Sequence, residues 1–223
     1  MDFDSFVLAA SIADLAAEAD AREHADAVEF RMDLAADPLA ALDDYDGDLP
    51  VLATNRVEWE GGEAADDEAR VEALCDAAAH PAVAAVDVEL AAIAAGDGRA
   101  AVEAAREEDA TAVVSVHDFE ETPPRAELAR LLEQAREFGD VGKLAVTARS
   151  RGDVLRLLAL THAQTEAGHA VATMAMGEAG RHSRAVAPVY GSRIGYAPVD
   201  PADATAPGQY DLRTLRRLVS DLG

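Results

Sequence analysis

The sequence predicts an α/β fold in which residues 1–223 form one (β/α)8 barrel (TIM barrel) domain. Short apolar runs rich in β-branched residues alternate with Ala-rich segments of helical period. Eight such strand–helix units in 223 residues leave about 28 residues per unit, which is the size of a βαβ module. No low-complexity linker divides the chain. Eight units of this kind most simply close into a barrel, for which this chain is short.

Each expected element follows from its local pattern. The strands are apolar runs of the kind that a parallel sheet buries, and they span residues 6–10, 27–32, 50–56, 83–90, 112–117, 143–147, 170–176 and 194–198. Helical period predicts helices over residues 12–22, 66–79, 99–108, 124–138, 153–166 and 211–221. The second and seventh helices have weak signals. Residues 199–209 form the one long irregular stretch, which we expect to be an active-site lid loop.

Composition excludes several classes of function. The chain has 43 acidic and 19 basic residues, a net charge of −24, so a nucleic-acid binder is not expected, because phosphate neutralisation needs clustered Lys and Arg. No run of about 18 apolar residues is present, which argues against a membrane span. The N-terminus does not resemble a signal peptide. We therefore expect a soluble cytoplasmic protein.

The acidity also predicts the solvent in which the protein works. Of the basic residues 18 are Arg, and the single lysine is Lys143. A surface dense in carboxylates, with lysine replaced or removed, is typical of proteins in concentrated salt, where self-repulsion is screened. We expect a halophile cytosol, and the alternative is an ordinary acidic protein.

Ionisable side chains recur near the ends of consecutive expected strands. They are Glu29 and Arg31, Arg56, Asp87 and Glu89, and then Ser115 and His117. Residues two apart point to the same face of a strand, and the carboxyl ends of barrel strands hold the active site. Each has a structural alternative: Glu29 and Arg31 could be an ion pair that plugs the barrel, and Asp87 and Glu89 could cap the following loop. Burying so many charges without a function would be costly.

Lys143 has the clearest chemical signal, because it lies within the apolar run Val141–Val146 of a protein that has lost every other lysine. An ammonium taken out of water gives up its proton more readily, and the free amine is a nucleophile for a ketone or aldehyde. Arginine cannot replace it. The alternative is a lysine that snorkels to the rim. With a nearby His117, whose orientation Glu89 could fix, an imine would allow proton transfer at the neighbouring carbon.

Two other classes of function stay open on the residues alone. A class I aldolase-type barrel also uses a strand lysine, but it usually needs a phosphate site in Gly-rich late loops, for which Gly191 and Gly208 are thin support. A catalytically silent barrel that binds a small carboxylate would not need both Lys143 and His117.

The ordered set of motifs resembles the type I 3-dehydroquinate dehydratases, the Schiff-base dehydroquinases of the shikimate pathway. The resemblance runs from Val28 to Gln209 and rests on Val28-Glu29-Phe30-Arg31-Met32-Asp33, Thr54-Asn55-Arg56, Glu60-Gly61-Gly62, Val86-Asp87-Val88-Glu89, Ser115-Val116-His117-Asp118-Phe119, Gly142-Lys143-Leu144-Ala145, Met174-Ala175-Met176-Gly177, Gly180, Ser183-Arg184, Gly191-Ser192 and Ala206-Pro207-Gly208-Gln209.

The resemblance implies a role for each matching residue. Lys143 would form the imine, His117 would move the proton, and Glu60 and Glu89 would be the supporting carboxylates. The residues implied around the substrate are Ser11, Glu29, Arg31, Arg56, Arg184, Thr205 and Gln209, with Met174, Met176 and Tyr196 as apolar walls. Two positions depart from the family pattern: Thr205 replaces a common Ser, and Asn55 replaces a common aromatic and should point out of the barrel.

The implied reaction is the dehydration of 3-dehydroquinate to 3-dehydroshikimate, a lyase reaction of aromatic amino-acid biosynthesis. The resemblance implies no cofactor, because the lysine supplies the electron sink. The sequence contains no His-x-His motif, so no metal site is expected. The small-molecule substrate is the one partner implied, and a homodimer is common among relatives.

Overall fold

The structure, a computed structural model, describes residues 1–65 and 68–223. Within these residues it has eight strands: β1 (Val7–Ile12), β2 (Ala27–Arg31), β3 (Val51–Thr54), β4 (Val83–Glu89), β5 (Thr111–Asp118), β6 (Val141–Thr147), β7 (Val171–Met176) and β8 (Ile194–Pro198). The helices are α1 (Glu18–Ala21), α2 (Pro38–Asp43), α3 (Glu68–Ala78), α4 (Leu90–Ala95), α5 (Arg99–Glu107), α6 (Arg125–Phe138), α7 (Arg151–Glu166), α8 (Ser183–Val186) and α9 (Leu212–Leu222). Short 3₁₀ turns occur at Leu15–Ala17, Met32–Leu34, Glu58–Glu60, Ala187–Tyr190 and Pro201–Asp203.

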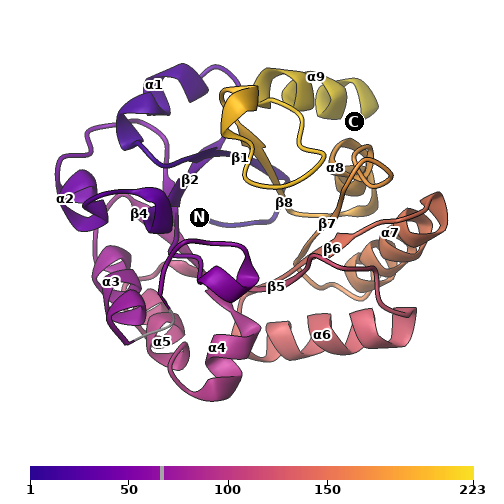
Figure 1. Cartoon of the computed structure of the whole chain (residues 1–223), viewed down its shortest axis with the longest axis horizontal. Coiled ribbons are helices and arrows are strands. Elements are labelled where there is room, and N and C mark those ends of the chain that lie inside the picture. The colour runs from indigo at the N-terminus through magenta and orange to yellow at the C-terminus, as the bar shows by residue number, and fades with distance from the viewer. Residues whose placement is uncertain (66–67) are drawn as a thin grey trace.

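The strands form one parallel sheet in the order β7-β6-β5-β4-β3-β2-β1-β8. The sheet curves until its two edge strands meet, where the backbone N–H of Arg193 donates to the carbonyl of Val171 at 2.8 Å. Figure 1 shows the strands around a common centre with the helices outside. The TIM barrel expected from the strand–helix alternation is therefore confirmed.

Most elements lie where the sequence pattern placed them, and the exceptions have local causes. The first expected helix, 12–22, is instead the end of β1, a 3₁₀ turn capped by the Asp14 side chain, and the single turn α1. The third strand ends at Thr54, so Arg56 lies in the loop after it. The expected helix 66–79 begins at Glu68 in the described chain, and residues 66 and 67 lie outside the described residues.

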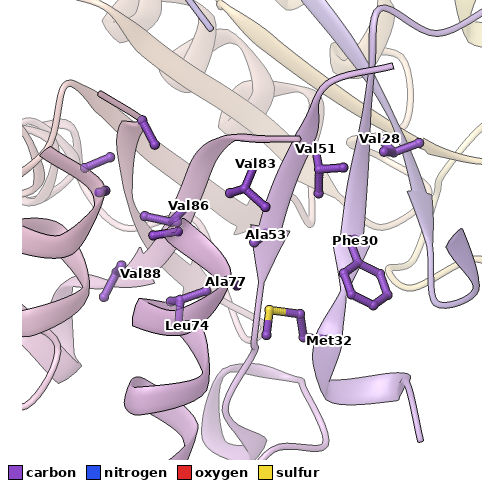
Figure 2. Packing of buried hydrophobic residues seen from close by; sticks show 14 of the residues in the cluster. Val28, Phe30, Met32, Val51, Ala53, Leu74, Ala77, Val83, Val86 and Val88 are labelled. Atoms are coloured by element: carbon purple, nitrogen blue, oxygen red, sulfur yellow. The ribbon is translucent and has the colours of Figure 1, made fainter. Parts of the chain in front are cut away.

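The core has an inner and an outer layer. Inside the barrel, small side chains such as Ala9, Ala27, Ala85 and Ala172 line the wall and leave room for larger polar groups. Outside, the other face of each strand packs on the helices. Figure 2 shows Leu74 and Ala77 of α3 near the outward-facing valines of β4.

No helix within residues 1–65 and 68–223 combines the length and the apolar character needed to cross a membrane.

Candidate active site

A cavity opens inside the barrel near the carboxyl ends of the strands and encloses about 520 Å³, its mouth included. Its walls are Glu29, Arg31, Thr54, Arg56, Glu60, Gly61, His117, Phe119, Lys143, Ala145, Met174, Met176, Arg184, Tyr196, Thr205, Ala206 and Gln209. Of the fourteen residues to which the family resemblance gives a role, twelve line this cavity, and Ser11 and Glu89 do not.

Lys143 points into the cavity from the middle of β6 and is only 3% exposed. Its Nζ donates to Asp87 Oδ2 at 2.7 Å. The ring of Tyr196 lies under the same nitrogen, with its centroid 4.2 Å away, in a cation–π contact. The amine is therefore held between an anion and an aromatic face, and it does not snorkel to the rim.

Arg56 organises the carboxylates of the barrel interior. Its guanidinium donates to Asp87 Oδ1 at 2.7 Å, to Glu89 Oε1 at 2.9 Å and to Ser115 Oγ at 2.9 Å. Glu89 also accepts from Arg70 of α3 at 2.9 Å. Because each group is paired and hydrogen-bonded, this buried network meets the conditions under which charges are tolerated in an interior.

The carboxylate that contacts His117 is Glu60, and Glu89 is directed to the two arginines instead. His117 Nδ1 lies 2.7 Å from Glu60 Oε2. The idea that Glu89 orients the histidine is therefore corrected. Glu60 reaches this position from the 3₁₀ turn after β3, because Gly61 ends the turn with φ +79°.

The Glu60–His117 pair is electrostatically set for proton transfer. Burial lowers the pKa of His117 well below its usual value, and the charges of Arg56 and Lys143 lower it further. Burial raises the pKa of Glu60 to about 8, against the opposing charge of Arg56. The imidazole of His117 is therefore neutral near pH 7, which is the state in which it can act as a base.

Arg184, from α8, is a buried cation with unsatisfied donors. It is 5% exposed, and its Nε and Nη2 have no hydrogen-bond partner among the described residues. Burial lowers the pKa of Arg184 to about 10. A buried charge without a partner is costly, so this guanidinium is adapted to receive an anion that enters the cavity.

Glu29 and Arg31 of β2 also line the cavity, and they do not form the ion pair with each other that the structural alternative required. Glu29 accepts from Ser11 Oγ at 2.5 Å and from Thr54 Oγ1 at 3.3 Å. Arg31 donates to Asp33 through Nε at 2.8 Å and Nη2 at 2.6 Å. Ser11 thus sits behind Glu29, a place from which it supports the cavity wall.

Residues 199–209 contribute Thr205 and Gln209 to the cavity. The segment is tied to the loop after β7, where Gly177 N–H donates to Pro207 O at 3.1 Å. Gly208 has φ +78°, and a Cβ there would come within 2.6 Å of the Gly177 carbonyl. This close approach explains why the segment needs glycine.

Sequence reasoning did not place several of the residues that shape the site. Asp87 and Lys143 were each singled out from the sequence, but the contact between them was not predicted. Arg70 lies on a helix outside the barrel and gives no local signal. The side chain of Asn55, which was expected to point out of the barrel, donates to the backbone carbonyl of Arg70 on α3 at 3.1 Å. This contact agrees with the expectation, because α3 lies outside the barrel.

Comparisons with known proteins agree with this geometry. The family model described as type I 3-dehydroquinase matches residues 6–223. A 3-dehydroquinate dehydratase from Haloarcula marismortui is 62% identical, covering 100% of this chain and 98% of that protein.

Two solved structures share the fold. The 3-dehydroquinate dehydratase from Geobacillus kaustophilus has TM-score 0.86 and 30% identity and covers 98% of this chain and 91% of its own. The type I 3-dehydroquinate dehydratase from Clostridium difficile, with covalently modified comenic acid, has TM-score 0.84 and 25% identity, with coverages of 98% and 92%.

Proposed function

We propose, from the premise that this chain belongs to the type I 3-dehydroquinase family, that its reaction proceeds through an imine on Lys143. The family's 3-dehydroquinate dehydratase activity is that of a hydro-lyase, which removes water to give 3-dehydroshikimate. One observation carries the mechanism: Lys143, His117 and Arg184, whose Nε and Nη2 have no partner among the described residues, line a single cavity. In the cell this reaction would serve the shikimate pathway.

The first step joins Lys143 to the C3 ketone of the substrate. The amine attacks the carbonyl carbon, and the carbonyl oxygen leaves as water, so that a protonated imine remains. The tight placement of Nζ against Asp87 and Tyr196 supports this step, since a fixed nucleophile avoids much of the entropic cost of reaction.

The second step eliminates water across C2 and C1. The imine withdraws electrons, so His117 can remove a proton at C2, and the C1 hydroxyl then leaves with a proton returned by the same imidazole. One imidazole accepts a proton in this step and then donates one, and its contact with Glu60 at 2.7 Å fixes the orientation of the ring for both transfers. Hydrolysis of the imine releases the product.

The remaining polar residues hold the substrate. Arg184 would pair with the carboxylate, as a guanidinium does in bidentate fashion. Glu29 and Arg56 would contact the ring hydroxyls, while Thr205 and Gln209 would cover the substrate from residues 199–209. The simplest test adds 3-dehydroquinate to the protein in molar KCl. An absorbance rise from the conjugated enone is expected, and a flat trace would favour a silent barrel.

Arg184→Met is expected to separate stability from activity. Loss of an unpartnered buried charge should raise the free energy of unfolding by about 1–3 kcal/mol, while KM rises by about 100-fold or more, because the substrate carboxylate loses its partner. Thermal unfolding and steady-state kinetics measure the two effects. Arg130→Met removes an exposed guanidinium from α6 and should change neither. An unchanged KM for Arg184→Met would contradict the carboxylate assignment.

Glu60→Gln is expected to change the pH dependence of kcat/KM. While Glu60 is protonated, its proton points at His117 Nδ1, which forces the imidazole proton onto Nε2 and blocks that nitrogen as a base. Ionised Glu60 instead accepts from Nδ1, and Nε2 becomes free. Because burial raises the pKa of Glu60 to about 8, kcat/KM should rise with pH up to that region.

A glutamine can accept from His117 Nδ1 at any pH, so the rise should move well below pH 8 in Glu60→Gln. The rise of kcat/KM with pH would then follow the ionisation of the imidazole, whose pKa burial has lowered. Rate–pH profiles of both proteins measure this difference. A rise of kcat/KM over the same pH range in both proteins would contradict the claim that Glu60 sets the tautomer of His117.

The net charge of −24 and the relative from a haloarchaeon support a halophilic protein. We expect Tm to rise by several degrees between about 0.1 M and 3 M KCl, because salt screens the repulsion between surface carboxylates. The gain should shrink near pH 4, where those carboxylates become protonated. Thermal melts in a KCl series test this, and a Tm that does not rise with salt would contradict it.

A further inference from the structure

Asp87 is a buried carboxylate to which the mechanism above assigns no step. It lies on β4 and is 0% exposed, and both of its oxygens are bound. Oδ1 accepts from Arg56 Nη2 at 2.7 Å and from Ser115 Oγ at 2.6 Å. Oδ2 accepts from Lys143 Nζ at 2.7 Å. One oxygen is therefore anchored by the barrel wall, and the other faces the reacting nitrogen.

The chemistry of imine formation shows why a fixed anion suits this position. An ammonium and a ketone condense to an iminium and one water. Two of the three N–H protons leave with the carbonyl oxygen, one proton stays on nitrogen, and the positive charge is conserved. A single carboxylate can therefore hold the same N–H and balance the same charge before and after condensation.

We propose that Asp87 is a further catalytic residue, which stays ionised throughout turnover and is the counter-ion of the Lys143 nitrogen, first as ammonium and then as iminium. The inference rests on the imine chemistry proposed above. It assigns to Asp87 no role as acceptor of the lysine protons, two of which leave with the carbonyl oxygen as water.

Three observations favour a permanent anion. Arg56 and Ser115 both donate to Oδ1, and donors of this kind stabilise a carboxylate in its ionised form. Burial alone would raise the pKa of Asp87, but the charges of Arg56 and Lys143 outweigh burial and hold it well below its usual range. The ring of Tyr196 on the same nitrogen also favours a cation there.

The counter-ion has a kinetic consequence. Removal of the C2 proton converts the iminium to an enamine whose nitrogen is neutral, and loss of the C1 hydroxyl restores the iminium. An anion at 2.7 Å favours the two iminium states, so it should increase the fraction of enzyme that borohydride can trap during turnover. A residue that only supports folding would not change how the bound substrate is divided between these states.

The test compares Asp87→Asn with the parent protein in molar KCl. Asparagine keeps the shape but removes the charge, and its NH2 group replaces one of the two acceptor oxygens. We expect kcat to fall by about 100-fold, the range seen when a preorganised electrostatic group is lost. The fraction of Lys143 reduced by borohydride in the presence of 3-dehydroquinate should fall by about tenfold. Because Lys143 is the single lysine of the chain, intact mass reports this fraction directly.

Ser115→Ala is the matched control, since it removes one donor to Asp87 but keeps the carboxylate beside Lys143. It should lose less than about tenfold in kcat and keep most of its trapped fraction. If Asp87→Asn does not fold, Asp87→Ala decides, because it removes the charge together with both acceptor oxygens. For that variant we expect a smaller trapped fraction than for Ser115→Ala.

The outcomes separate this inference from the proposed function. A folded Asp87→Asn protein, or Asp87→Ala in its place, with the parent's trapped fraction and kcat would overturn the counter-ion role and leave the imine mechanism intact. Failure to trap any adduct on the parent would overturn the imine mechanism and the counter-ion role together. A reduced trapped fraction in the Asp87 variant, together with normal thermal unfolding, supports the imine mechanism and the counter-ion role.

Discussion

Replacement of Lys143 by Ala is expected to lower kcat by at least about 10⁴-fold, because the variant has no amine with which to form an imine. Without the imine the C2 proton is not acidified, so His117 cannot remove it at a useful rate. Activity measured from the enone absorbance gives the effect. The cavity should remain, so quinate-like ligands that contact Arg184 should still bind.

Lys143→Arg is the matched control for charge. It keeps a cation opposite Asp87, which avoids leaving that carboxylate with Arg56 alone, but a guanidinium is not a useful nucleophile. We expect it to be as inactive as the alanine variant and to retain more stability. Turnover by either variant within about tenfold of the parent rate would refute imine catalysis.

Replacement of His117 by Ala is expected to lower kcat by about 10²–10⁴-fold, since one imidazole transfers both protons of the elimination. Imine formation should survive, because Nζ of Lys143 and its contacts with Asp87 and Tyr196 do not depend on the imidazole. The variant should therefore accumulate the imine of the unreacted substrate. Borohydride reduction followed by intact mass distinguishes the substrate adduct from the dehydrated one.

His162→Ala serves as the control for the histidine, because His162 is exposed on α7 and its ring meets that of Tyr190 edge to face, away from the cavity. It should behave as the parent protein does. If His117→Ala gave only the dehydrated adduct at the parent rate, another group would have to move the proton.

Much of the site could be predicted because a strand has a period of two residues. Glu29 and Arg31 share a face, and so do Ser115 and His117, and the structure places each pair inward. Lys143 could be recognised because it is the single lysine of the chain and lies in an apolar run. These signals are local, so a single sequence contains them.

What could not be predicted depends on the register between strands and on loops. The two-residue pattern put Asp87 and Glu89 on one face, but only the barrel register brings Asp87 to Lys143 and leaves Glu89 with Arg56 and Arg70. Glu60 lies in a 3₁₀ turn with no periodicity, so its contact with His117 depends on the path of the loop.

The most direct measurement of the central claim is borohydride reduction of the protein in the presence of 3-dehydroquinate, followed by intact mass and peptide mapping. We expect one irreversible adduct per chain, located on Lys143, with no adduct in Lys143→Ala or when substrate is left out. Full turnover without any adduct on Lys143, or an adduct that persists in Lys143→Ala, would contradict it.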